Sequence, residues 1–178
     1  MKIFKFGGAS VKDAEGVKNV LHVLNTVGHE DVLLVISAMG KTTNALEVVI
    51  KNYFDKSKEL HASLQEVRKY HNQILLDLFE DEDHDVFFDI NAHFDDLEYF
   101  IRSNKSPNYS FVYDQVVSIG ELVSTTIVSH YFNYSGLKNN WIDVRPLIKT
   151  DNNYRDAQVD WETTQKLISK GVKKKTLN

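Results

Sequence analysis

The chain opens with a strand, a glycine turn, a helix and a second strand, and this order constrains the fold more than any other feature. Residues 1–6 are largely apolar and end at Gly7-Gly8. Apolar residues then recur at helical spacing as far as Gly28, which is placed to cap that helix. Residues 32–36 are apolar throughout, which is typical of a strand covered on both faces. Two strands joined by a helix predict a parallel βαβ unit and therefore an α/β fold.

The rest of the chain is predicted to be mostly helical. Apolar spacing predicts a helical insertion around residues 45–105 and a further helix over 116–132. The stretch "WIDV" at 141–144 predicts another strand. A last helix is expected to begin after Asp160, its N-cap, and to stop at Gly171.

Composition excludes several classes of protein. The chain has 178 residues, a net charge of −4 and no cysteine, and 42% of its residues are hydrophobic. We expect one ordered domain without disulfides or thiolate metal sites, and no attraction to nucleic acid or membranes. The N-terminus lacks the apolar region of a signal peptide, and no apolar run reaches membrane-spanning length. A cytoplasmic protein is expected.

The first candidate site is the stretch "KFGGAS". A strand that leads into glycines and a helix presents backbone N–H groups, which bind anions and most often phosphate. Lys5 adds a cation at the same strand end, Gly7 and Gly8 leave the backbone bare, and Ser10 adds a hydroxyl. The alternative is a tight turn without a ligand, which is the more frequent role of paired glycines after a strand.

The second candidate site is the stretch "SAMGKTTN" at residues 37–44. Its Gly-Lys-Thr sequence resembles the end of a Walker A loop, but that motif requires glycine where Val35 stands. A polar loop remains, with hydroxyls that include Thr43. Both loops follow strands, and the carboxyl ends of parallel strands meet at one edge where ligands bind.

Glu121 interrupts an otherwise apolar helical pattern in "SIGELVST". It is either a solvated helix position or an inward carboxylate that receives the ammonium group of a substrate, since a buried carboxylate needs such a partner. Carboxylates and histidines also gather in residues 80–96. Their spacing matches no standard metal motif, so a charged loop and a solvated helix face are favoured and no metal site is expected.

Taken in order and spacing, four stretches resemble the N-terminal part of the aspartokinases, in the amino-acid kinase superfamily. They are "KFGGAS" with Val11, "SAMGKTTN", "SIGELVST" and "DVRPLIKTD". The resemblance implies a three-layer αβα sandwich, of which this chain is the N-terminal, amino-acid-binding part. It also implies transfer of the γ-phosphate of MgATP to the side-chain carboxylate of L-aspartate. The product, 4-phospho-L-aspartate, leads to lysine, threonine and methionine.

The resemblance assigns roles to seven residues. Lys5 is expected to be catalytic and to reach the transferred phosphoryl group. Gly7, Gly8 and Ser10 are expected to bind phosphate beside it. The substrate side is expected to consist of Thr43 for a carboxylate of aspartate, Glu121 for its α-ammonium group, and Arg145 in the D-V-R block.

The chain departs from the family pattern in two ways. Ala9 stands where threonine is commoner. The G-R-G-G-S-D block, the nucleotide lobe and the regulatory ACT domains are missing from residues 1–178, which we therefore interpret as a partial amino-acid kinase domain. The isolated chain is expected to be inactive, to lack a complete MgATP site, and to form a homo-oligomer through an exposed sheet edge and apolar face.

Two alternatives to this function remain open. One is a non-catalytic binding or assembly module that retains the kinase fold. The other is a different kinase of the superfamily, which would need a different acceptor pocket.

Overall fold

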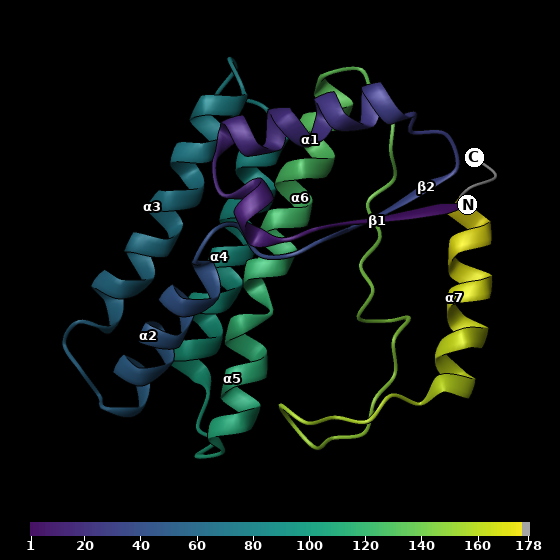
Figure 1. Cartoon of the computed structure of the whole chain (residues 1–178). Coiled ribbons are helices and arrows are strands. Elements are labelled where there is room, and N and C mark those ends of the chain that lie inside the picture. Colours follow the sequence, from purple (N-terminus) through teal and green to yellow (C-terminus); the bar gives the residue numbers. More distant parts are fainter. Residues whose placement is uncertain (176–178) are drawn as a thin grey trace.

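The computed structural model describes residues 1–175 and has an α/β architecture (Figure 1). It begins with strand β1 (Lys2–Phe6), a short 3-10 helix η1 (Gly8–Val11), helix α1 (Ala14–Val27) and strand β2 (Val32–Ile36). The helices that follow are α2 (Thr42–Phe54), α3 (Leu60–Leu78), α4 (Asp85–Ser103), α5 (Tyr109–Val117), α6 (Ile119–Tyr134) and α7 (Trp161–Lys175).

The predicted βαβ unit is confirmed. Strands β1 and β2 pair in parallel, with Lys2 opposite Val32 and the register continuing to the ends of both strands. Helix α1 is capped at its N-terminus by Asp13, whose carboxylate accepts a hydrogen bond from the N–H of Gly16 at 2.8 Å. It ends at Gly28, whose N–H donates to the carbonyl of Leu24 at 2.9 Å. The two caps fix where the chain turns back toward the sheet.

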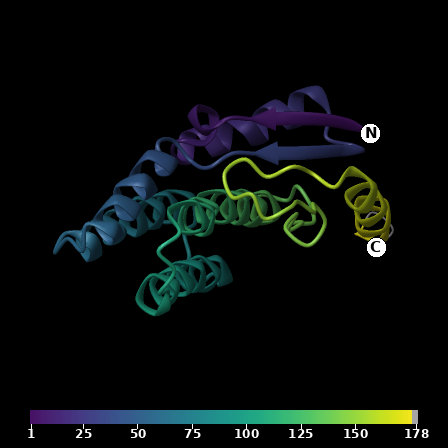
Figure 2. The same cartoon turned by 90° about the horizontal axis from the view of Figure 1, so that it is seen from below.

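Only one face of β2 is covered in the described residues, so the prediction of a strand covered on both faces is wrong there. Phe4 and Leu34 pack against the hydrophobic core. On the opposite face, Ile3 is 62% exposed and Val35 is 46% exposed. In Figure 2, β1 lies outermost and β2 lies between it and α6. The expected homo-oligomer, in which a second copy of the chain would cover this apolar face, stays a prediction.

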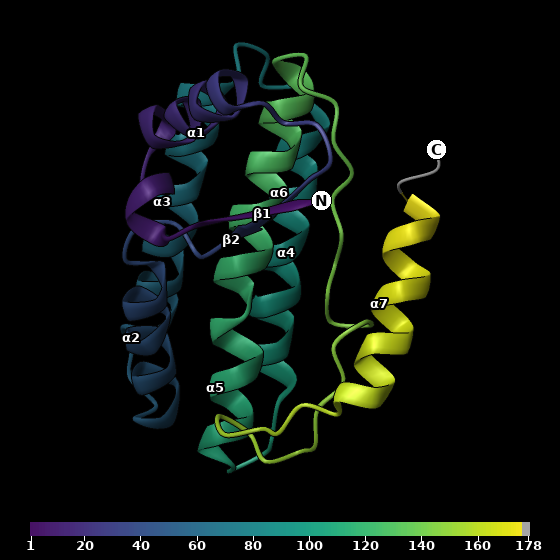
Figure 3. The same cartoon turned by 45° about the vertical axis from the view of Figure 1, so that its right-hand side comes forward.

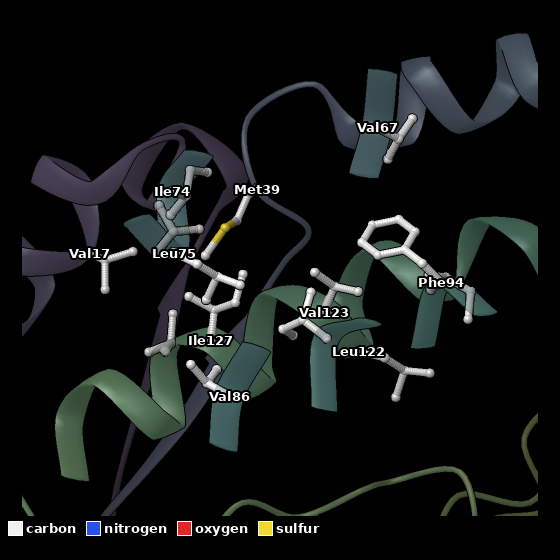
Figure 4. Close-up of a cluster of buried hydrophobic side chains, with 14 of the residues drawn as sticks. Val17, Met39, Val67, Ile74, Leu75, Val86, Phe94, Leu122, Val123 and Ile127 are labelled. Atoms are coloured by element: carbon white, nitrogen blue, oxygen red, sulfur yellow. The ribbon is translucent and has the colours of Figure 1, made fainter. Parts of the chain in front are cut away.

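The core lies between helices α1 to α6, and Figure 4 shows part of it. Helix α6 is central, because it contacts β2, α3, α4 and α5, and side chains on nearly all its sides are buried. Met39, in the loop after β2, is fully buried and points into this core beside Leu75 and Ile127. The loop that contains the second candidate site is therefore anchored by its own apolar side chain.

The predicted strand at residues 141–144 is wrong. In the described chain the sheet consists of β1 and β2, and these residues follow α6 without strand structure. The indole Nε1 of Trp141 donates to Thr125 Oγ1 of α6 at 2.9 Å, and Asp143 accepts from the backbone N–H of Arg145 at 3.0 Å. The Trp141 contact holds the segment against α6, a distant helix in the sequence, instead of beside a strand. The bond between Asp143 and Arg145 adds a local turn, which also competes with a strand ladder.

Two predicted helix boundaries also need correction. The helix expected over 116–132 is two helices, α5 and α6, which meet at Ser118. Asp160 does cap α7, since its carboxylate accepts from the N–H of Thr163 at 3.0 Å, but α7 continues past Gly171. A Cβ atom at Gly171 would lie 2.9 Å from a methyl carbon of Leu147, so this glycine permits close packing instead of ending the helix.

The stretch from the end of α6 to α7 is mostly irregular. It contains one isolated antiparallel bridge between Thr150 and Val159. Figure 3 shows this segment running from the top of α6 to α7, which lies apart from the main helical body. The sites predicted from the sequence lie mainly in the preceding residues.

Candidate functional site

The loop after β1, which contains Gly7 and Gly8, touches the loop after β2, which contains Gly40. We call these the first and the second glycine loop, and they meet at the carboxyl ends of the two strands. The N–H of Gly40 donates to the carbonyl of Gly8 at 2.9 Å, and the N–H of Ser37 donates to the carbonyl of Phe6 at 3.1 Å. A Cβ atom at Gly8 would lie 2.6 Å from the carbonyl oxygen of Ala38. Because this space is too small for a side chain, glycine is needed at position 8 for the loops to meet. The predicted meeting of the two loops is confirmed.

The start of α6 joins the same place. The Oε1 atom of Glu121 accepts a hydrogen bond from the N–H of Ala38 at 3.4 Å. One turn further along α6, the hydroxyl of Ser124 donates to the carbonyl of Ser37 at 2.8 Å. Three motifs that are far apart in the sequence are therefore brought together by direct contacts.

Glu121 is half-buried and lies in the first turn of α6. Its carboxylate has one side-chain hydrogen bond to the described residues, and that bond is long. The N-terminal end of a helix favours a negative charge, so the carboxylate is stabilised there without a paired cation. The carboxylate keeps further lone pairs that can accept hydrogen bonds, including those of an ammonium group.

Lys5 provides a positive charge at the end of β1. Its side chain is exposed and forms no ion pair within residues 1–175. Two residues further on, a Cβ atom at Gly7 would meet nothing within 4 Å, so the backbone there is open to a ligand. Ser10 is exposed, and its N–H donates to the carbonyl of Gly7 at 2.9 Å. A cation beside bare backbone fits a phosphoryl group.

Thr43 is half-buried in the first turn of α2, directly after the second glycine loop. Arg145 lies elsewhere. Its guanidinium donates to Asp143 at 2.7 and 3.0 Å, and the two side chains hold the pKa of Asp143 low and that of Arg145 high. Arg145 lines a hollow of about 150 Å³ with Asp96 and Ser118. Of the predicted residues, Arg145 is the one whose described contacts are not with the glycine loops.

Two residues of α3 were missed as members of this region. The hydroxyl of Tyr70 donates to the carbonyl of Lys12, and Nε2 of His71 lies 3.3 Å from Oγ1 of Thr42. Burial lowers the pKa of His71 to about 4, although the Val67 carbonyl opposes that shift. In the sequence, His71 stands at helical spacing among apolar residues such as Val67 and Ile74, and this pattern gives no sign of a contact with a loop.

A larger hollow lies between α4 and α6, with a volume of about 330 Å³. Its polar groups pair with one another: His130 lies 3.1 Å from Asp89, and His93 lies 3.5 Å from the hydroxyl of Thr126. Burial, helped by the charge of Arg145, lowers the pKa of His93. The lining residues are Asp89, Ala92, His93, Asp96, Thr126, His130 and Trp141.

The acidic stretch before α4 forms a loop and a helix start. Nδ1 of His84 accepts from the N–H of Val86 at 3.1 Å and so caps α4. This agrees with the interpretation of residues 80–96 as a charged loop and a helix face.

The sequence model of the amino acid kinase family matches residues 1–173. The chain belongs to the amino acid kinase family. It is 29% identical over 150 residues to bifunctional aspartokinase/homoserine dehydrogenase 2 of Escherichia coli, covering 84% of this chain and 18% of that protein. It is 30% identical over 142 residues to the chloroplastic aspartokinase 1 of Arabidopsis thaliana, covering 76% of this chain and 24% of that protein.

Solved structures of aspartokinases share the fold of this family member. E. coli aspartokinase III in complex with lysine and aspartate superposes with a TM-score of 0.84 at 21% identity, over 98% of this chain and 38% of that one. The same enzyme in complex with aspartate and ADP gives the same TM-score over 97% of this chain. The chain thus spans about a fifth of the E. coli bifunctional relative and less than two fifths of aspartokinase III.

No helix among the described residues is both long and apolar enough to cross a membrane.

Proposed function

We propose that this chain forms the aspartate-binding part of an aspartokinase, which transfers the γ-phosphate of ATP to the side-chain carboxylate of L-aspartate. The contact between Glu121 and Ala38 carries the proposal, because it joins the expected ammonium-binding carboxylate to the two glycine loops. The aspartokinase relatives and the aspartate complexes of aspartokinase III support the choice of substrate.

In this proposal Glu121 receives the α-ammonium group of aspartate, and Thr43 donates a hydrogen bond to one of its carboxylates. An oxygen of the side-chain carboxylate then forms a bond to the γ-phosphorus, and the bond from that phosphorus to the β-γ bridging oxygen breaks, so ADP leaves. Lys5 offsets negative charge on the transferred phosphoryl group, while Gly7 and Gly8 allow close approach and Ser10 offers a hydroxyl. Such transfer depends on positioning and charge neutralisation more than on covalent chemistry.

MgATP is the co-substrate in this proposal, and the residues present fit its phosphate end. The observation is the open space at Gly7 beside an exposed lysine without an ion pair in the described part of the chain. When bound, MgATP supplies the phosphoryl group and its metal neutralises phosphate charge. The nucleotide base and ribose are assigned to sequence outside residues 1–178, so residues 1–178 are proposed to be a partial kinase domain.

The role of Arg145 in substrate binding stays a proposal that needs a rearrangement. Its guanidinium would have to leave Asp143, or the pair would have to act together on the substrate.

The substrate assignment is tested by titrating the chain with L-aspartate, followed by NMR, with D-aspartate and L-glutamate as comparison ligands. Glu121→Gln keeps the shape and removes the charge. A charged hydrogen bond contributes about 1.5–3 kcal/mol, so L-aspartate affinity should fall by roughly 10- to 100-fold. Glu47→Gln is the matched control, since Glu47 is another helix glutamate with one hydrogen bond, from Tyr113 at 2.7 Å.

Equal affinities of the Glu121 variant and the native chain would contradict the role of Glu121. No L-aspartate binding by the native chain would contradict its proposed function as an aspartate-binding part. A hydroxamate assay with aspartate and MgATP is expected to show no turnover by the chain alone. Aspartate binding without turnover would also agree with the alternative of a non-catalytic binding module, and turnover above a blank would contradict the proposed partial domain.

A further inference from the structure

The middle of α3 touches both glycine loops, although none of the sequence motifs lies on that helix. The hydroxyl of Tyr70 donates to the carbonyl of Lys12, which follows the first loop. The same hydroxyl lies against Gly40 in the second loop, since a Cβ atom at Gly40 would be 2.7 Å from it. Gly40 has a φ of +54°, a conformation that side chains disfavour, so glycine both permits the turn and leaves room for Tyr70.

His71, the next residue of α3, contacts the other end of the second loop. It is fully buried, and its Nδ1 lies 2.8 Å from the carbonyl of Val67. Because a carbonyl only accepts, Nδ1 carries the hydrogen and Nε2 is left as an acceptor. Nε2 faces the hydroxyl of Thr42 at 3.3 Å, and that hydroxyl also lies 2.6 Å from the carbonyl of Met39.

The Thr42 hydroxyl therefore has one hydrogen and two acceptors around it. Its stronger bond is the shorter one, to the carbonyl of Met39, and His71 borders it from the other side. The buried imidazole remains neutral, which keeps Nε2 available as an acceptor. Thr42 immediately precedes Thr43, so the buried ring of His71 lies against the residue before Thr43.

We propose that Tyr70 and His71 are positioning residues that fix the two glycine loops relative to each other, and thereby set the spacing between Gly8 and Thr43. Only the expected effect on aspartate affinity rests on the proposed function. The positioning of the loops is inferred from contacts alone. Tyr70 lies between Lys12 and Gly40, and His71 lies beside Thr42. Gly40 is in turn hydrogen-bonded to Gly8.

The exposure of Tyr70 separates this role from a general contribution to the core. Tyr70 is 36% exposed, so its ring buries less apolar surface than a core residue, and its hydroxyl contacts lie at the loops. Tyr53 offers a matched control. Its hydroxyl also donates to a backbone carbonyl, that of Asn104, at 3.1 Å.

The direct test is hydrogen exchange of the Gly40 amide, followed by NMR, because that N–H donates to Gly8 across the two loops. Tyr70→Phe removes only the hydroxyl, and Gly40 exchange is expected to become about tenfold faster, as for loss of one hydrogen bond. Tyr53→Phe is expected to leave the exchange of Gly40 unchanged. Equal exchange in the native chain and Tyr70→Phe, or equal acceleration in both variants, would overturn the proposal.

His71 is tested in the same way with His71→Phe, which keeps a ring between Tyr70 and Phe94. Faster Gly40 or Thr42 exchange is expected. Unchanged exchange of both amides in His71→Phe would overturn the part played by His71. If that variant does not fold, His71→Leu is measured in its place and is judged in the same way.

The consequence for the ligand is a separate readout. Tyr70→Phe should weaken L-aspartate binding about three- to tenfold, while Tyr53→Phe should not. Faster Gly40 exchange with unchanged aspartate affinity would overturn the link to the site. Absence of aspartate binding in the native chain would instead contradict the proposed function, and Gly40 exchange would still decide whether α3 fixes the loops.

Discussion

The glycine loops and the hollow between α4 and α6 use polar groups in opposite ways. In the hollow, side chains pair with each other, as His130 does with Asp89 at 3.1 Å. At the loops, the hydrogen bonds that join them to each other and to α6 each include a backbone N–H or carbonyl, and the charged side chains Lys5 and Glu121 keep capacity for a further partner. The hollow is therefore the weaker candidate for a ligand site. Unused charge next to open backbone is the stronger indication of a ligand.

Replacing Lys5 should have the largest effect and would test the loop side of this comparison. In a chimaera in which this chain replaces the matching segment of E. coli aspartokinase III, Lys5→Ala is expected to lower kcat roughly 10²–10³-fold, because one charge contact to the transition state is lost. The change in KM for aspartate should be smaller. Lys2→Ala, at the other end of β1, is the control. A near-normal kcat in the Lys5→Ala variant would show that Lys5 is not a catalytic residue.

His71 beside the loops and His93 in the hollow allow the two regions to be compared by their dependence on pH. His71 has a pKa of about 4 in the folded chain, against about 6.5 when unfolded. The unfolded state therefore binds the proton first as pH falls, and the free energy of unfolding should decrease by about 3 kcal/mol between pH 6.5 and 4. Above pH 6.5 both states are neutral there and this contribution is fully present.

Urea unfolding across that pH range measures the effect. His71→Phe should remove most of the pH dependence. His93→Gln should remove less of the pH dependence. Burial also lowers the pKa of His93, but this side chain is only half-buried. The reverse order would show that the hollow, not the loop region, controls acid stability.

The paired glycines give a sharper test within one loop. Gly8→Ala places a Cβ atom 2.6 Å from the carbonyl of Ala38 and should reduce the free energy of unfolding by about 1–3 kcal/mol. Gly7→Ala, where the added atom meets nothing within 4 Å, should change it much less. Thermal unfolding of the two variants decides this, and equal losses would contradict the close contact between the loops.

The smallest effect is expected in the hollow. Asp89→Asn removes the charge partner of His130, and both side chains are partly exposed. Such pairs contribute about 0–1 kcal/mol, so stability should fall slightly and L-aspartate affinity should not change. A marked loss of aspartate affinity would show that the hollow belongs to the functional site.

Local patterns of the sequence predicted the βαβ unit and most helices well. Helix caps such as Asp13 and Gly28 act over one turn, so the sequence shows them directly. The strand at 141–144 and the stop at Gly171 failed for a common reason. Trp141 bonds to α6 and Gly171 packs against Leu147, and both are contacts with distant or separate segments.

The candidate site divides in the same way. The sequence by itself determined which residue types are available: the lysine and glycines after β1, the hydroxyls after β2, and Glu121 in an apolar helix. Only the tertiary structure decided that Glu121 bonds to Ala38 and that Tyr70 of α3 bonds to the carbonyl of Lys12 beside the first loop. Residue identity and short-range spacing can be read directly from the sequence. Contacts between residues far apart in the sequence depend on how the helices pack, and packing is a property of the whole core.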